Sequence, residues 1–354
     1  MTTICGLPSL AVEENMRQVM PPDSDLETLA LAFARAAWST LVEPGDRVAG
    51  QLIALCGPER ALQFLIDRFR ADEIVTECAA LEEGEFDAGV FEEDLAEAIF
   101  RWQPRLSSSD TLNAVTHAAG LGAFLIAPEQ EQWPRGLSDL GLHAPLVLWA
   151  RGQREVLGAF ENSLAVVGAR ASTGYGEHVT METVSTIAQL GVAIVSGAAY
   201  GIDGMAHRSA IAVGGTTMAF LAGGVDRFYP SGHDALLGRI METGLVLAET
   251  PCGYAPTKWR FLLRNRLIAA ASQATVVMEA GWRSGSLNTA NHASTLGRPL
   301  GVVPGPVTSA ASAGCHRLLR EYDAVCVTNA AEMLELLPGQ GPALSESEQE
   351  LVGR

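Results

Sequence analysis

Residues 164–170 read Leu-Ala-Val-Val-Gly-Ala-Arg, and residues 172–176 continue Ser-Thr-Gly-Tyr-Gly. A short apolar run is typical of a buried strand, and glycines directly after it are typical of a tight turn into a helix. The same alternation recurs with apolar runs at 192–195, 217–221, 245–247, 275–278 and 300–303. Six strands alternating with helices predict an α/β fold with a doubly wound parallel sheet.

The composition excludes several classes of protein. With 354 residues, of which 48% are hydrophobic, the chain is long enough for two or three domains with sizeable cores. The six cysteines form no C-x-x-C pair, so we expect no metal and no cofactor, and a reducing cytosol is the simplest setting. We see no uncharged apolar stretch of about 18 residues and no leader peptide, and we therefore expect a cytoplasmic protein without membrane contact.

A formal net charge of −17 argues at first against nucleic acid, because DNA is a polyanion. The charge is unevenly distributed, however. Residues 1–150 hold 24 acidic and 9 basic residues, whereas residues 151–354 hold 17 and 15. The acidity therefore belongs to the front of the chain and leaves the predicted sheet free to bind an anion.

Three regions are expected. Residues 1–105 are acidic and show apolar residues at helical spacing, which predicts a helical domain. Residues 106–336 form an extended domain that contains the predicted sheet, and 337–354 form a linker and the possible start of another helix. The acidic run that begins at Glu82 and ends at Asp94 is most simply a solvated surface, and a docking site for a basic partner is the alternative.

Small and polar residues follow three of the predicted strands, where parallel sheets bind their ligands. The loop after the first strand contains Arg170 and Ser172, the next contains Ser196 and Gly197, and the loop after the fifth contains 284–286, Ser-Gly-Ser. Glycines allow backbone N–H groups to approach an anion, and a helix N-terminus favours it. The spacing is not that of the dinucleotide fingerprint G-x-G-x-x-G, so each loop alone is weak evidence.

The segment 257–266, Thr-Lys-Trp-Arg-Phe-Leu-Leu-Arg-Asn-Arg, combines four basic residues with two aromatic ones, and Lys258 is the only lysine in the chain. Proteins hold single-stranded DNA with phosphates on cations and bases stacked on aromatic rings. The alternative is that Phe261 belongs to the core and the arginines are solvated. The predicted DNA-binding residues are Arg170, Ser172, Ser196, Gly197, Lys258, Phe261, Arg264, Asn265, Arg266, Ser284, Gly285 and Ser286.

Two further positions carry titratable groups. Asp203 and His207 would share a helix face, and we interpret them as a helix cap and a histidine bonded within the helix rather than as an acid–base or metal pair. Glu279 follows the fifth strand. It is either a catalytic base or a carboxylate that holds hydroxyl and N–H groups of a loop in place, and no catalytic residue is predicted.

Together these motifs resemble the DNA-processing protein A family, also called DprA or Smf. The resemblance covers about 160 residues. It rests on Val166-Val-Gly-Ala-Arg170, Val195-Ser-Gly197, Gly201-Ile-Asp203, Ala206-His207, Tyr229-Pro230, Phe261, Arg264-Asn-Arg-Leu-Ile268, Val277-Met-Glu-Ala280, Ser284-Gly-Ser-Leu287, Gly297-Arg298, Val303-Pro-Gly305 and Gly314-Cys315.

The resemblance implies a Rossmann-like domain preceded by an N-terminal helical (SAM-like) domain. It also implies a role in natural transformation and competence that involves no catalysis: a homodimer coats incoming single-stranded DNA, shields it from nucleases and loads the RecA recombinase for DNA recombination. Many relatives carry a C-terminal winged-helix domain, and we expect residues 337–354 to contain at most the start of a truncated one.

Two other functions remain open. A phosphoribohydrolase-like enzyme would use the same loops for a nucleotide and Glu279 for glycosidic cleavage, but such enzymes resemble one another in a Pro-Gly-Gly-x-Gly-Thr loop followed by a glutamate, which 281–289 lacks. A sensor that binds a small nucleotide would not need the basic and aromatic segment 257–266.

Overall fold

A computed structural model describes residues 3–80 and 88–339 of the chain. The chain divides into two compact units: the first comprises 1–133, 141–150 and 249–254, and the second comprises 134–140, 151–248 and 255–354. Part of the acidic run, 82–87, and the tail 340–354 lie outside the described residues, so the predictions made for them stay predictions.

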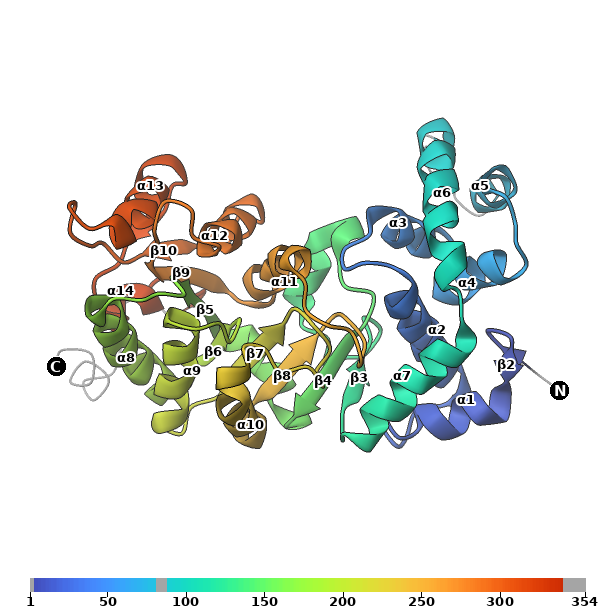
Figure 1. The fold of residues 1–354 in the computed structure, drawn as a ribbon, viewed down its shortest axis with the longest axis horizontal. Helices are drawn as coiled ribbons and strands as arrows, with labels where there is room; N and C mark the ends of the chain where they lie inside the picture. The colour runs from blue at the N-terminus through green and yellow to red at the C-terminus, as the bar shows by residue number, and fades with distance from the viewer. Residues whose placement is uncertain (1–2, 81–87, 340–354) are drawn as a thin grey trace. The chain divides into compact units, whose positions relative to one another are not determined.

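The first unit is mainly helical (Figure 1). Its seven described α-helices pack around an apolar core, and two short antiparallel strand pairs accompany them. The expected domain boundary between residues 105 and 106 stays a prediction. The last of the seven helices begins after that position and packs on the first two. The elements are β1 Thr3–Ile4, β2 Leu7–Pro8, α1 Ser9–Met16, α2 Leu26–Leu41, α3 Arg47–Cys56, α4 Pro58–Ile66, α5 Ala71–Ala79, α6 Ala88–Trp102, α7 Ser108–Gly120, β3 Phe124–Ile126 and β4 Leu148–Gly152.

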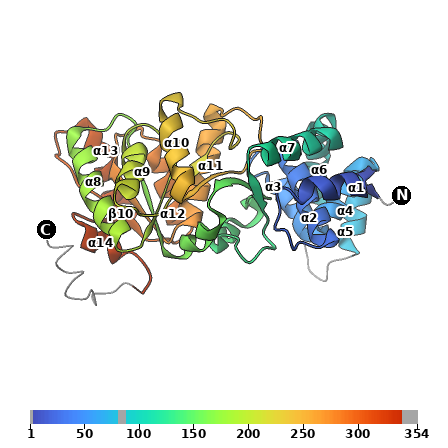
Figure 2. The ribbon, with the colours of Figure 1, turned by 90° about the horizontal axis from the view of Figure 1, so that it is seen from below.

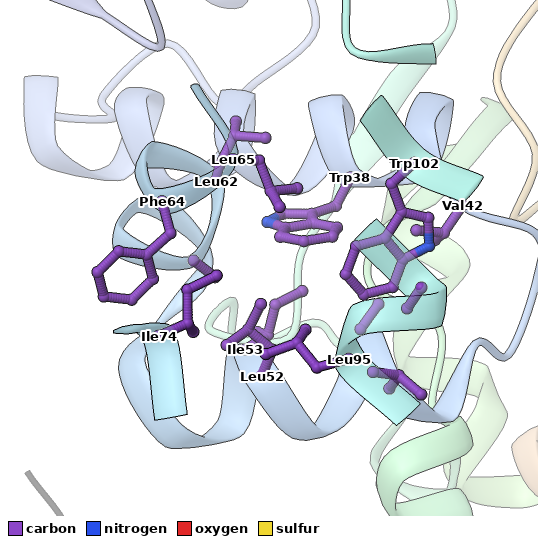
Figure 3. Packing of buried hydrophobic residues seen from close by; sticks show 14 of the residues in the cluster. Trp38, Val42, Leu52, Ile53, Leu62, Phe64, Leu65, Ile74, Leu95 and Trp102 are labelled. Atoms are coloured by element: carbon purple, nitrogen blue, oxygen red, sulfur yellow. The ribbon is translucent and has the colours of Figure 1, made fainter. Parts of the chain in front are cut away.

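Two tryptophans lie at the centre of this helical core (Figure 3). The Trp38 and Trp102 rings meet edge to face, with 5.3 Å between their centroids, and both side chains are almost completely buried. The Trp38 indole N–H also donates to the carbonyl oxygen of Pro58 at 3.0 Å. A single residue of α2 therefore links α6 to the start of α4.

The second unit is the predicted Rossmann-like parallel sheet. Its strands follow the order β11-β10-β9-β5-β6-β7-β8, and all neighbouring pairs are parallel. The six predicted strands are confirmed, and a seventh of only two residues was missed. They are β5 Ser163–Gly168, β6 Ala193–Ser196, β7 Thr217–Leu221, β8 Leu245–Ala248, β9 Ala274–Glu279, β10 Leu300–Val302 and β11 Val325–Cys326.

Helices cover both faces of this sheet (Figures 1 and 2). One layer holds α8 Gly174–Gln189, α9 Ile202–Ala212, α10 Asp234–Thr243 and α14 Ala330–Leu334. The other holds α11 Lys258–Ala271, α12 Ser286–Thr295 and α13 Ala313–Glu321. Because buried strands have apolar side chains on both faces, these layers explain why the strand sequences read as continuous apolar runs rather than alternating ones.

The strand order reverses at β5, since the chain runs outward through β6, β7 and β8 on one side and through β9, β10 and β11 on the other. Such a topological switch point leaves a crevice at the carboxyl ends of the two strands that flank it, here β5 and β9. The fold therefore directs the search for a site to the loops that follow Gly168 and Glu279.

The tryptophan pair makes a prediction about stability. Trp38→Ala should lower the free energy of unfolding by about 3–5 kcal/mol, because it removes a buried ring and leaves a cavity. Chemical denaturation followed by circular dichroism measures the change. Phe100→Ala is the matched control, since Phe100 is 83% exposed. Equal stability of the two variants would contradict the central role of Trp38.

Candidate nucleic-acid interface

A pocket of about 550 Å³ opens at the switch point of the second unit. Its wall comes from the β5–α8 loop, the first half of α11, the β9–α12 loop and the 3₁₀ turn Ala310–Ser312 before α13. Seven of the predicted DNA-binding residues line it: Arg170, Phe261, Arg264, Asn265, Ser284, Gly285 and Ser286.

The β5–α8 loop is fixed by a buried carboxylate. Thr173 caps α8 by accepting the Gly176 N–H with its hydroxyl oxygen at 3.2 Å. Glu279, at the end of β9, accepts the Thr173 backbone N–H at 2.8 Å and the Thr173 hydroxyl at 2.6 Å, one with each carboxylate oxygen. A Cβ atom at Gly176 would lie 2.6 Å from this carboxylate, so any other residue there would displace Glu279 from its present position. The arrangement favours the loop-holding interpretation of Glu279.

The β6–α9 loop is fixed in a similar way. Ser196 is fully buried and donates its hydroxyl to the Val166 carbonyl oxygen at 2.6 Å. Asp203 accepts the N–H groups of Gly197 and Ala199 at 3.2 and 3.4 Å. Burial raises the pKa of Asp203, while Arg264 and these N–H groups oppose the rise.

Two predictions about α9 were therefore wrong. The N-cap residue of α9 is Gly201, which offers no side chain, and Asp203 stabilises the preceding loop instead of capping the helix. His207 is not bonded within α9, because its Nδ1 atom lies 2.7 Å from the Thr217 hydroxyl of β7. Both errors come from reasoning within one helix when the partners lie in other elements.

A buried arginine of α11 ties the helix to the β6–α9 loop. Arg264 donates to the carbonyl oxygens of Gly197, at 2.7 Å, and Phe220, and it is only 6% exposed. A Cβ atom at Gly197 would lie 2.3 Å from the guanidinium, so only glycine permits this approach. Burial lowers the pKa of Arg264 to about 10, although Asp203 opposes the shift.

The neighbouring residue connects α11 to the β9–α12 loop. The Asn265 side-chain N–H groups donate to the Gly285 carbonyl at 3.3 Å and to the Asn288 side chain at 3.2 Å, and its side-chain oxygen accepts Arg264 Nε at 3.2 Å. Arg264 and Asn265 thus hold two loops from one helix. Both line the floor of the pocket, but their polar atoms are engaged within the protein.

The exposed part of the pocket contains an aromatic ring between cations. Phe261 is half-buried, with the Arg170 guanidinium 5.0 Å from its ring centroid and Arg264 5.9 Å from it. The Tyr229 ring lies 5.3 Å away. Arg170 is exposed and comes from the β5–α8 loop, so this arrangement joins residues that lie far apart in the sequence.

The β9–α12 loop supplies hydroxyl groups, a helix N-terminus and one cation that was missed. The Ser284 and Ser286 hydroxyl oxygens lie 2.8 Å apart, and α12 begins at Ser286. Arg283 is exposed and lines the pocket, but it was not among the predicted residues. Its position just before Ser284 in a predicted anion-binding loop is the signal that was available.

Five predicted residues do not line the pocket. Ser172 donates to the Glu177 carboxylate at 2.8 Å, and Lys258 is exposed in the first turn of α11. The other three, Ser196, Gly197 and Arg266, are buried.

Over residues 3–80 and 88–339, no group of three or more His, Cys, Asp and Glu side chains is arranged to hold a metal ion. Within the same ranges, no helix has the length and apolar character needed to span a bilayer.

The sequence model of the family described as DNA recombination-mediator protein A matches residues 124–338. The chain belongs to this family. A relative from Mycobacterium tuberculosis, named a putative DNA processing protein DprA, is 50% identical over 226 residues, which cover 61% of this chain. The match spans 58% of the length of that relative.

Two solved structures of the family resemble this one. DNA processing protein A from Streptococcus pneumoniae has 27% sequence identity and a TM-score of 0.63, over 86% of this chain and 96% of its own. DNA processing protein A from Helicobacter pylori, described with a unique single-stranded DNA binding mode, has 28% identity and a TM-score of 0.52, over 58% of this chain and 92% of its own. The predicted membership of the family is confirmed.

The buried and exposed arginines of the pocket should respond differently to substitution. Arg264→Ala should lower the free energy of unfolding by about 3–5 kcal/mol, because it leaves the buried Asp203 carboxylate without its compensating charge. Arg170→Ala should change it by about 0.5 kcal/mol or less, because Arg170 is exposed. Urea denaturation of both variants measures the difference, and similar losses would show that Arg264 is not a structural brace.

His207 should make stability depend on pH. Burial, with smaller contributions from the charges of His233, Arg264 and Arg208, lowers the pKa of His207 to about 3 from its ordinary 6.5. The unfolded chain therefore binds the extra proton first, so this contribution to stability is complete above pH 6.5 and declines as the pH falls from 6.5 toward 3. Denaturation at pH 7.5, 6.0 and 4.5 should show a steeper decline for the native chain than for His207→Gln. Parallel declines would be the contrary result.

Proposed function

We propose that this chain binds single-stranded DNA by holding backbone phosphate in the pocket and stacking a base at Phe261. The observation that carries the proposal is the convergence of two exposed arginines, Arg170 and Arg283, with the start of α12 and a half-exposed aromatic ring around one pocket. Arginines and helix N-termini favour phosphate, and aromatic rings accept any base.

The local charge supports this proposal despite the acidity of the whole chain. Arg170 and Arg283 are exposed at the pocket, while Asp203, the acidic residue that lines it, is buried and already accepts two backbone N–H groups. An approaching phosphate therefore meets guanidinium groups before it meets a carboxylate. A pocket of about 550 Å³ also lies within the size range of small-ligand sites, which suits one nucleotide unit of a strand.

Lys258 remains a proposed DNA-binding residue, although it does not line the pocket. It is exposed and lies three residues before Phe261 on α11, so the two side chains share one side of the helix. A strand that leaves the pocket along α11 would meet this cation next. The buried predicted residues act differently: Arg264, Asn265, Ser196 and Gly197 position the loops, and they affect DNA binding through them.

The family relationship supports a role in recombination. The family description names a recombination mediator, and the relative from Helicobacter pylori is described by its binding of single-stranded DNA. We infer that this chain, as a cytoplasmic homodimer, coats and protects incoming single-stranded DNA during natural transformation and loads the RecA recombinase onto it. This role needs neither a cofactor nor a catalytic residue.

The contacts of Glu279 speak against the nucleotide-hydrolase alternative. A general base must reach the proton that it abstracts, directly or through one water. Both carboxylate oxygens of Glu279 accept hydrogen bonds from Thr173, and the side chain is 3% exposed. Release of free base from nucleoside monophosphates, measured by chromatography, would be the finding that favours the enzyme.

Fluorescence anisotropy of a labelled thymidine oligomer at several salt concentrations tests the binding proposal. The native chain should bind less tightly as salt increases, and Arg170→Ala should reduce the slope of log K against log salt by about 0.7, as expected for one lost phosphate contact on a single strand. Phe261→Ala should cost about 1–3 kcal/mol of binding free energy through the lost base stack.

Arg239→Ala is the matched control, since Arg239 is an exposed arginine of α10 in the helix layer opposite α11. It should leave both the affinity and the slope unchanged. Salt-independent binding by the native chain, or equal effects of Arg170→Ala and Arg239→Ala, would show that phosphate is not held in this pocket.

A further inference from the structure

A second exposed aromatic residue lies beside the pocket. Trp282 is 59% exposed and stands in the β9–α12 loop between Gly281 and Arg283, both of which line the pocket. Four of the other five tryptophans, Trp38, Trp102, Trp133 and Trp149, are buried. Because more than half of Trp282 is exposed, its indole does not serve the core. Single exposed apolar residues are common, however, so a second observation is needed before a function is inferred.

That second observation is an anchored cation on the ring. The guanidinium of Arg317, on α13, lies 5.3 Å from the centroid of the Trp282 ring. Arg317 Nε in turn donates to the Glu321 carboxylate at 2.7 Å, one helical turn further along α13. The guanidinium is therefore held beside the indole from the side of α13, while more than half of the indole surface stays open to solvent.

The backbone fixes the spacing between the loop and α13. The Gly314 N–H donates to the Ala280 carbonyl oxygen at 2.7 Å, and a Cβ atom at Gly314 would lie 2.5 Å from the Gly281 carbonyl oxygen. Only glycine permits so close an approach in the first turn of α13. Trp282 and Arg317 consequently come from two elements whose backbones are in direct contact, and their stacking does not depend on flexible side chains alone.

We propose that Trp282, backed by Arg317, is a second base-stacking subsite that holds the nucleotide next to the one in the pocket. The inference rests on the proposed function. Arg283 lies between this subsite and the pocket and is exposed, so it is placed to hold the phosphate that joins the two nucleotides. A strand would then pass from Phe261 across Arg283 to Trp282.

The charge around the indole favours a nucleic acid over a protein partner. Arg317 lies over the ring and bonds to Glu321, and the exposed Arg283 is the next residue along the chain after Trp282. An arginine stacked on an aromatic ring leaves its hydrogen-bonding edge available for phosphate, as in proteins that bind single strands without sequence preference. A second copy of this chain is the alternative occupant.

Affinity as a function of oligomer length tests the subsite. Thymidine monophosphate can occupy only one of the two sites, whereas a thymidine oligomer of about 4 nucleotides can occupy both. Competition of each ligand with a labelled oligomer, followed by anisotropy, gives the gain in affinity on lengthening. Trp282→Ala should reduce this gain about tenfold while it leaves the binding of the monophosphate nearly unchanged. Trp282→Phe should restore part of the gain, because a phenyl ring also stacks. Phe100→Ala, an exposed aromatic residue of α6, is the control and should have no effect.

The other outcomes overturn the proposal in distinguishable ways. If the native chain binds neither the monophosphate nor the oligomer, the proposed function fails and the subsite fails with it. If the native chain binds both and Trp282→Ala keeps the full gain with length, the pocket stands and the subsite does not exist. If Trp282→Ala instead changes the oligomeric state in gel filtration without changing the gain with length, the indole contacts a second copy of the chain.

Discussion

The buried charges of Asp203 and Arg264 are the constraint on which the pocket depends. Asp203 accepts the N–H groups of Gly197 and Ala199, while Arg264 donates to the Gly197 carbonyl, so the β6–α9 loop is held from both sides. Each charge lowers the cost of burying the other, and removing one leaves an uncompensated ion in the core. The position of α11 against the sheet, and with it the position of Phe261, follows from this pair.

The site therefore combines a rigid buried frame with a small number of exposed contacts. Glu279 holds the β5–α8 loop, and Asn265 holds the β9–α12 loop. Glycines stand where these braces approach the backbone, since a Cβ atom at Gly176 or Gly197 would collide with them. Preorganised loops reduce the entropy that binding must otherwise overcome. A few exposed arginines and one ring can then suffice for a site.

The strands and the position of the pocket at their carboxyl ends were predictable because both follow from local pattern. Apolar runs locate the strands, and parallel topology brings the residues after them to one edge. The roles of individual side chains were less predictable. Arg264 and Arg170 look alike in the sequence, yet one is buried on backbone carbonyls and the other is exposed. Likewise, Asp203 and His207 find partners in other elements, which spacing within a helix cannot show.

The choice of cation also fits the proposed binding of a polyanion by an acidic protein. All but one of the 24 lysines and arginines are arginine. A guanidinium can stack on a ring and still offer hydrogen bonds at its edge, whereas an ammonium group is a compact charge without a flat face. Besides the buried Arg264 beside Phe261, the same pairing occurs near the pocket with Arg170 on Phe261 and Arg317 on Trp282. Each pair presents charge and an aromatic surface together, so few basic residues are needed even though the chain carries a net charge of −17.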